Sequence, residues 1–434
     1  MTAKFKIRGF DAGLFAVLAV FACLTLPIVM LDLTGAYDGD ESLFHVPNIR
    51  KIRQHWPQLD LRMDSVSAVS PGYHYFLAAV SLMTGDSLKS LRLINWIVSL
   101  GIPVTLYLYV RRRIEGPWVS SLLLFPLVSS SFVVKSGVWV FTDNAALLLG
   151  TLAILAMLSG RTSLGFSFLI GGLSGLAVFA RQLYAWLSLP IIVRAVVISC
   201  SELKLRHRLM MVAGVSIPTL VVLKLYLAWG GFVPPAWREA SLKVSLCPVA
   251  YILANFALFG LLFMPFEGLS QMRRLVLRRS SAAAVVLGLL AAVVSPTSFN
   301  HAEGRWGGYL WWIADLFPVI EDRSVFFLAA APVGALVISL IWSMMRSVQL
   351  RGESTLWLSC VVAWAGSFVL NRQVFQRYFE PTIIVLLVLA VVQIHERTAT
   401  VPNKGHVSRL IVLTLFQLLV TSATVFWSIF GKGV

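Results

Sequence analysis

Acidic residues follow the first apolar stretch of the chain directly, in the segment "LTGAYDGDESLFH". Asp38, Asp40 and Glu41 lie there, just beyond an uncharged run from Ala12 to Leu31. An ionised group is costly inside a bilayer, so charges at the edge of an apolar stretch often mark a functional site. A carboxylate in such a place can take a proton from a hydroxyl nucleophile.

Three further polar groups also lie at the ends of apolar stretches. They are Thr142–Asp143–Asn144, Arg181–Gln182, and a later segment that holds Asn371, Arg372, Arg377 and Tyr378. Guanidinium groups bind phosphate through paired hydrogen bonds. Carboxylates and arginines together therefore suit the attack of a hydroxyl on a carbon that carries a phosphate leaving group. Each group alone also has a simpler explanation, as a solvated acid, a helix cap or a contact with lipid headgroups.

The composition indicates a membrane environment. The 434 residues are 58% hydrophobic and 13% charged, whereas a soluble domain carries roughly 25% charged residues. We therefore predict an all-α polytopic membrane protein. The net charge of +16 does not indicate nucleic-acid binding, because Lys and Arg gather on the cytoplasmic loops of any multispan protein. The four cysteines are scattered, without the spacing of a metal site.

About thirteen apolar segments are candidate spans, since a crossing takes about 20 residues. They are 12–32, 93–110, 117–134, 143–159, 163–180, 183–199, 209–228, 248–264, 281–296, 324–344, 355–371, 378–395 and 408–429. The first run is longer than a signal-peptide core, so it is predicted to remain as a span with a cytosolic N-terminus.

The segment Gly72–Met83 is apolar but short, and the loop charges decide how it lies. If it does not cross, every cytoplasmic loop is basic, as the positive-inside rule requires. We therefore predict that it lies along the membrane. The result is a long external loop with two surface helices, the other one around Glu41–Trp56, where apolar residues recur every three or four positions. This topology places all four polar groups on the non-cytosolic side.

Short motifs occur in order along the first half of the chain. The acids belong to a "DE…FH.P" pattern formed by Asp40, Glu41, Phe44, His45 and Pro47. Further matches are Pro71, Gly72 and Tyr75; Leu91, Arg92 and Asn95; Phe141, Thr142 and Asp143; Ala180, Arg181 and Gln182; and Arg377, Tyr378 and Phe379. On these residues the chain resembles the GT-C class of integral-membrane glycosyltransferases. More narrowly, it is similar to the dolichyl-phosphate-glucose-dependent α-1,2-glucosyltransferases (the DIE2/ALG10 family).

The likeness covers roughly residues 33–190 and has departures. One extra residue separates the acids from the Phe-His pair, and Asp143 stands where the family has glutamate. The resemblance implies one GT-C domain over residues 1–434, with about 13 transmembrane helices and two juxtamembrane helices. Its parts are a first span at 12–32, an external loop at 33–90, a transferase core at 91–228 and variable C-terminal spans at 229–434.

The resemblance also implies an activity. A hexose, glucose in this family, would move from a dolichyl- or polyprenyl-phosphate donor to a hydroxyl of a lipid-linked oligosaccharide or another extracytoplasmic glycan. The transfer would be inverting, with an α-1,2 linkage and with neither a metal nor another cofactor. The membrane would be a bacterial or archaeal cytoplasmic membrane or that of the endoplasmic reticulum, with the active site on the non-cytosolic face.

The resemblance assigns roles to residues at the motif positions. Asp40 is expected to be the base that activates the acceptor hydroxyl, with Glu41 as its neighbour or substitute. His45 and Asp143 are expected to bind sugar hydroxyls or to orient the acceptor. Arg181, Arg372 and Arg377 are expected to hold the donor phosphate, and Gln182 and Tyr378 are expected to bind the substrate as well.

Other functions remain open. A GT-C transferase with a mannose or aminoarabinose donor would share these features. A secondary transporter or lipid flippase would also have many spans, but transporters often show internal repeats and helices broken near the midplane. The charges here lie at span ends instead. The external loop at 297–323 is rich in aromatic residues, which suits either the acceptor glycan or an interfacial aromatic belt.

Overall fold

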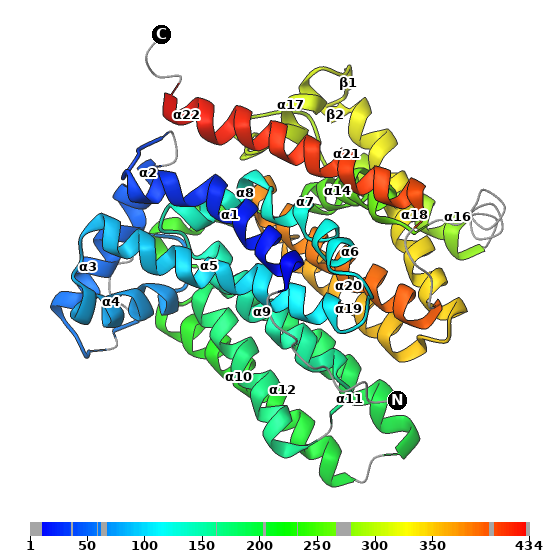
Figure 1. The fold of residues 1–434 in the computed structure, drawn as a ribbon, viewed down its shortest axis with the longest axis horizontal. Coiled ribbons are helices and arrows are strands. Elements are labelled where there is room, and N and C mark those ends of the chain that lie inside the picture. The colour runs from blue at the N-terminus through cyan, green and yellow to red at the C-terminus, as the bar shows by residue number, and fades with distance from the viewer. Residues whose placement is uncertain are drawn as a thin grey trace.

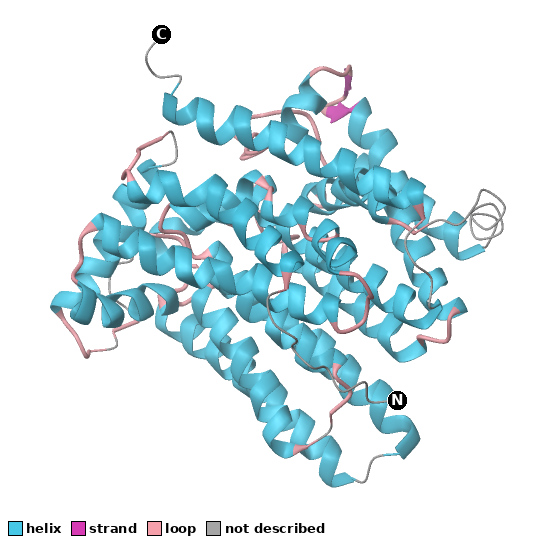
Figure 2. Ribbon diagram, in the orientation of Figure 1, coloured by secondary structure: helices cyan, strands magenta, loops and turns pink. Residues whose placement is uncertain are grey.

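The fold is almost entirely helical (Figures 1 and 2). The computed structural model describes residues 11–35, 38–58, 60–61, 67–161, 163–202, 205–231, 233–265, 279–398 and 403–430. Within them, the one sheet is a short antiparallel pair, β1 (Val319–Ile320) and β2 (Arg323–Ser324). The predicted all-α fold is therefore confirmed.

The elements follow one another along the chain in two halves. The first half contains α1 (Ala12–Met30), α2 (Asp38–Asp40), η1 (Glu41–His45), α3 (Val46–Gln54), α4 (Gly72–Thr84), α5 (Leu88–Arg111), α6 (Pro117–Leu122), α7 (Phe125–Val128), α8 (Ser131–Val138), α9 (Asp143–Leu158), α10 (Leu164–Ala180), η2 (Gln182–Leu187), α11 (Ser188–Glu202) and α12 (Leu205–Trp229). The second half contains η3 (Pro235–Trp237), α13 (Arg238–Ser241), α14 (Cys247–Phe263), α16 (Arg279–Val294), α17 (Tyr309–Asp315), α18 (Val325–Ser347), α19 (Arg351–Ser367), η4 (Gln376–Tyr378), α20 (Glu380–Thr398), α21 (Lys404–Thr421), η5 (Ser422–Phe426) and α22 (Trp427–Phe430).

Several helices are long and apolar enough to cross a membrane. In the described residues there are 5 of them: α1, α5, α18, the segment Gln376–Thr398 that joins η4 to α20, and the segment Lys404–Phe430. Five further apolar helices have 10–17 residues. The chain is thus a multi-pass membrane protein, but the predicted number of thirteen spans is not confirmed.

The stretch predicted as one span at 117–134 is broken, so this part of the prediction is wrong. It forms α6, α7 and the start of α8, with Pro117 and Pro126 in the first turns of α6 and α7. Proline cannot donate a helical hydrogen bond and therefore interrupts a continuous helix. Ser130 then caps α8 by accepting a bond from the Phe132 amide at 3.3 Å. Next, the chain bends by 114° between α8 and α9.

The two helices expected in the external loop are present. They are η1 with α3, and α4, which pack against each other and lie together on the left of Figure 1. Ile49 and Ile52 turn into the core from α3, as the apolar periodicity predicts. That these helices lie along the membrane surface stays a prediction.

Close helix packing determines where α9, α10 and η2 lie. Helix α10 packs on both α9 and α12. A Cβ atom at Gly171 would come within 2.3 Å of the Gly214 carbonyl oxygen, so only glycine permits this approach of α10 to α12. The C-terminal end of α10 therefore has a fixed place beside the start of α9.

Candidate active site

Polar residues from segments far apart in the sequence meet at one place. Asp40 of α2 forms an ion pair with Arg377 of η4, with 2.7 Å between Oδ2 and Nη1. Asp143, the first residue of α9, forms an ion pair with Arg181 at the end of α10. The Tyr378 ring centroid lies 4.6 Å from the guanidinium carbon of Arg181 and 5.2 Å from that of Arg377. We call these five residues the ion-pair cluster.

The two ion pairs of the cluster differ in exposure. The Asp40 side chain is 37% exposed and that of Arg377 is 28% exposed. The side chains of Asp143 and Arg181 are 16% and 8% exposed. Asp40 is therefore the carboxylate of the cluster that a substrate reaches most readily.

Four residues of the cluster, Asp143, Arg181, Arg377 and Tyr378, line a small cavity of about 30 Å³. Other residues that line it are Ser136, Asn144, Tyr184, Trp364 and Thr382. Since one water needs roughly 10–15 Å³ by this measure, the cavity has room for about two or three waters. A sugar phosphate would fit only after the surrounding side chains move.

Arg377 has hydrogen-bonding capacity left after its ion pair. Nη1 donates to Asp40, and Nη2 makes a longer bond of 3.3 Å to the Tyr378 hydroxyl. Nε is buried and has no hydrogen-bond partner among the described residues. Because a guanidinium carries five donors, Arg377 can hold an anion in addition to Asp40.

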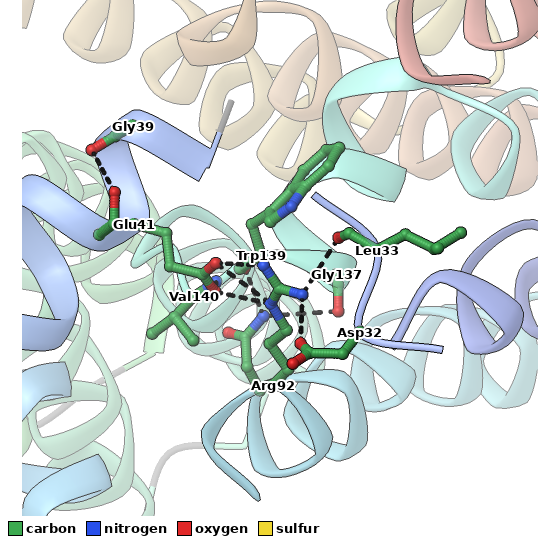
Figure 3. A network of polar contacts seen from close by, with 10 residues as sticks. Asp32, Leu33, Gly39, Glu41, Arg92, Gly137, Trp139 and Val140 are labelled. Carbon is green, nitrogen blue, oxygen red and sulfur yellow. Dashed lines mark hydrogen bonds and ion pairs between the residues drawn. The ribbon is translucent and has the colours of Figure 1, made fainter. Parts of the chain in front are cut away.

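Glu41, the next residue after Asp40, is placed very differently (Figure 3). Arg92 Nε lies 3.1 Å from both Glu41 carboxylate oxygens, and Arg92 Nη2 donates to Oε2 at 2.5 Å. The Val140 amide also donates to Oε1, at 2.8 Å. The side chains of Glu41 and Arg92 are 1% and 0% exposed. Glu41 therefore stabilises the fold, and its carboxylate does not lie in the ion-pair cluster.

The same network fixes the bend that leads to Asp143. Arg92 Nη1 donates to Asp32 at 2.7 Å and to the Leu33 carbonyl at 3.1 Å. Asn95 Nδ2 donates to the carbonyl oxygens of Ser136 at 2.8 Å and Trp139 at 2.9 Å. The Arg92 bonds connect α5 to the end of α1, and the Asn95 bonds connect α5 to the end of α8 and to Trp139, where a broken span would otherwise leave polar groups unpaired.

Two other expected binding residues have structural partners. Gln182 Oε1 accepts from the Ser70 amide at 2.8 Å, and Gln182 Nε2 donates to the Ala68 carbonyl at 2.7 Å. Gln182 thus attaches the segment before α4 to η2. Arg372 donates to the carbonyls of Ala302 and Glu239 at 3.0 and 3.3 Å. The structure therefore does not bring Arg372 into the ion-pair cluster with Arg181 and Arg377.

His45 lies beside the cluster as half of a histidine pair. Its Nδ1 is 2.8 Å from His74 Nε2, and its ring meets that of Phe141 edge-on at 5.5 Å. Burial, together with the charges of Arg377 and Arg181, lowers the pKa of His45 to about 3. Burial also lowers the pKa of His74. Both rings are therefore neutral at pH 7, and one donates its N–H to the other.

Sequence reasoning missed several buried polar residues near the cluster. Glu380 and Gln376 are completely buried at the start of α20 and in η4, and Lys135 is buried in α8. The sequence did mark two of them, because a lysine within an apolar segment, such as Lys135, and an acid at the start of one, such as Glu380, are both unusual. Among the described residues, no group of three or more His, Cys, Asp or Glu side chains has the arrangement of a metal site.

Comparisons with known proteins give a weak structural likeness. No family model matches the chain, and no curated protein matches it in sequence. Two solved structures of ArnT from Cupriavidus metallidurans, in the apo state and bound to undecaprenyl phosphate, are similar at 12% identity. The matches cover 88% of this chain and 77% and 78% of those chains, with TM-scores of 0.39 and 0.37. At such low scores, the roles of residues rest on the geometry of this chain alone.

Proposed function

We propose that this chain is a GT-C glycosyltransferase that moves a hexose from a polyprenyl-phosphate donor to a hydroxyl of an extracytoplasmic glycan. The observation that supports this function is the ion-pair cluster. It joins a partly exposed carboxylate, Asp40, to a guanidinium, Arg377, that still has donors to offer. A base for the acceptor and a site for the leaving phosphate thus lie side by side.

Asp40 acts as the base in this mechanism. It takes the proton of the acceptor hydroxyl while the acceptor oxygen bonds to the anomeric carbon of the sugar. The bond from that carbon to the phosphate oxygen breaks, and the polyprenyl phosphate leaves with both bonding electrons. Asp40 loses one negative charge as the phosphate gains one.

Arg377 suits this exchange of charge. Its guanidinium donates to Asp40 through Nη1. The Nε–H group, and the Nη2 N–H group that does not point to Tyr378, remain as donors for the phosphate. The total negative charge beside Arg377 therefore stays constant as the proton moves. Fixed cations of this kind stabilise developing charge without reorganisation during the reaction.

Arg181 and Tyr378 complete the phosphate site, and Asp143 orients Arg181. The cation–ring contacts of Tyr378 with Arg181 and Arg377 hold two positive groups close together despite their repulsion. Such closeness is favourable only with anions nearby. Asp40 and Asp143 supply them in this structure, and the donor phosphate would add another.

The glucose donor, the α-1,2 linkage and a lipid-linked oligosaccharide acceptor are the finer part of this proposal, and the motif resemblance supports them. Mannose and aminoarabinose donors are the alternatives. The test is to offer the protein in nanodiscs a panel of polyprenyl-phosphate sugars with glycan acceptors, and to measure transfer and release of polyprenyl phosphate. Transfer of glucose alone supports the narrow proposal. Movement of lipid between leaflets without any transfer would instead indicate a flippase.

A further inference from the structure

Glu380 is a completely buried carboxylate close to the ion-pair cluster in sequence, at the start of α20. Four side chains donate hydrogen bonds to it. They are Ser130 at 2.6 Å and Gln417 at 3.0 Å on Oε1, and Tyr309 at 2.6 Å and Gln376 at 2.9 Å on Oε2. A buried carboxylate needs this many hydrogen-bond donors, because an unpaired charge in a low-dielectric interior is costly.

The polar atoms of Gln376 also have hydrogen-bond partners. Its Oε1 accepts from the Tyr251 hydroxyl at 3.0 Å and from the Leu310 amide at 3.1 Å. Its backbone N–H donates to the Gly307 carbonyl at 2.6 Å. With the bond from its Nε2 to Glu380, the polar groups of this side chain have partners on several sides.

These partners belong to elements that are distant in the sequence. Ser130 precedes α8, Tyr251 lies in α14, Tyr309 in α17 and Gln417 in α21. Lys135 of α8 adds a favourable charge interaction with Glu380. We call Gln376 and Glu380 with their partners the η4 junction, since four helical regions meet there around one three-residue turn.

The turn that the junction holds carries Arg377 and Tyr378. Gln376 points into the junction and is 0% exposed, whereas the Arg377 side chain is 28% exposed and reaches Asp40. The backbone of η4 therefore connects a rigid buried network on one side to the ion-pair cluster on the other. A misplacement of about 1 Å at such a site can cost about a hundredfold in rate.

We propose that Gln376 and Glu380 are positioning residues that hold Arg377 and Tyr378 where they bind the phosphate of the lipid donor. This inference rests on the proposed function. The junction acts through the backbone of η4 and does not touch the substrate. Its loss therefore weakens phosphate binding and leaves acceptor binding unchanged.

The test uses Gln376→Met, which keeps the approximate shape of the side chain and removes its hydrogen bonds. The affinity of the purified protein for undecaprenyl phosphate is measured, together with the KM values of donor and acceptor. We expect about tenfold weaker phosphate binding or more, in keeping with the loss of several buried hydrogen bonds. The donor KM should rise by a similar factor, and the acceptor KM should not change.

Two further variants keep the test specific. Gln393→Met makes the same substitution at another buried glutamine of α20, and should leave phosphate affinity unchanged. Tyr251→Phe removes one hydroxyl of the junction and should weaken phosphate binding about three- to fivefold. This milder variant carries the test if Gln376→Met does not fold.

A double variant separates positioning from general damage. In an Arg377→Ala background, Gln376→Met should weaken phosphate binding by less than about twofold further, because residues that act through one another are not additive. Full additivity, or wild-type affinity in both Gln376→Met and Tyr251→Phe, would overturn this inference alone. Failure of the wild-type protein to bind any polyprenyl phosphate would overturn the proposed function, and this inference with it.

Discussion

Asp40 and Glu41 are neighbours in the sequence, yet their carboxylates have different surroundings. Glu41 is buried, and Arg92 and the Val140 amide satisfy its oxygens. Asp40 is 37% exposed and shares one hydrogen bond with Arg377. A carboxylate beside an arginine is therefore not by itself evidence of a functional site. The number of partners and the exposure distinguish the site from the scaffold.

The two arginines show the same contrast. Arg92 uses Nε and both Nη atoms, for Glu41, Asp32 and the Leu33 carbonyl. Arg377 leaves Nε without an acceptor among the described residues. A saturated guanidinium stabilises the fold, and a partly used one can bind an incoming anion.

Loss of the proposed base Asp40 should reduce turnover more than any other substitution. Asp40→Asn should lower turnover by about 10²–10⁴-fold, the usual contribution of a general base. Its unfolding temperature should change little, because partly exposed ion pairs contribute at most about 1 kcal/mol. Single-turnover transfer and thermal unfolding in detergent measure the two quantities. Transfer within tenfold of wild type would remove Asp40 as the base.

Glu41→Gln should give the opposite result. Removal of one partner from a buried ion pair typically costs about 3–5 kcal/mol of stability. The free energy of unfolding should therefore fall strongly, while turnover per folded molecule stays close to that of the wild type. Denaturant titration combined with transfer assays on the folded fraction tests this. A stable variant without activity would place Glu41 in the chemistry.

The next effect concerns the donor phosphate at Arg377. Arg377→Lys keeps the charge but loses the paired hydrogen-bond geometry, so the donor KM should rise about ten- to a hundredfold, as for lost hydrogen bonds to a charged group. Steady-state kinetics with varied donor measures this. Arg372→Lys is the matched control and should change the donor KM by less than about twofold, because Arg372 donates to the carbonyls of Ala302 and Glu239 outside the cluster. Equal effects of the two variants would contradict the placement of the phosphate.

A smaller effect is expected of pH on the unfolding temperature, through the pKa of His45. The pKa of His45 is about 3 in the folded protein and about 6.5 in an unfolded chain. Between these values the unfolded state binds more protons, so stability is full above about pH 6.5 and falls as the pH drops toward 3. The unfolding temperature of the wild type should therefore fall between pH 7 and pH 5. His45→Gln should reduce this slope, whereas the exposed His55→Gln should not.

The sequence allowed prediction of the helical membrane fold and of the segments that form the ion-pair cluster. Charges beside apolar stretches are visible in any sequence, and the loop charges placed Asp40, Asp143, Arg181 and Arg377 on one side. The partners could not be predicted, since no spacing in the sequence pairs Arg92 with Glu41 or Arg377 with Asp40. The break at 117–134 had a signal in its two prolines, but prolines also occur inside intact helices here, as Pro103 in α5 shows.

The η4 junction was beyond sequence reasoning for a different reason. Glu380 is visible as an acid at the start of an apolar run, but its donors come from the regions of α8, α17, η4 and α21. Only the tertiary packing brings such distant side chains to one carboxylate. Arg372 shows the converse, because a suitable residue type near the right place bonds elsewhere.

Release of polyprenyl phosphate shows whether Asp40 is the base of the transfer reaction. Wild-type protein, Asp40→Asn and Glu41→Gln are each incubated in nanodiscs with a radiolabelled polyprenyl-phosphate hexose and acceptor glycan. Our account predicts that the wild type and the folded fraction of Glu41→Gln release the lipid phosphate and label the acceptor, while Asp40→Asn binds the donor without turning it over. Equal release by Asp40→Asn and the wild type, or no release from any donor by the wild type, would contradict it.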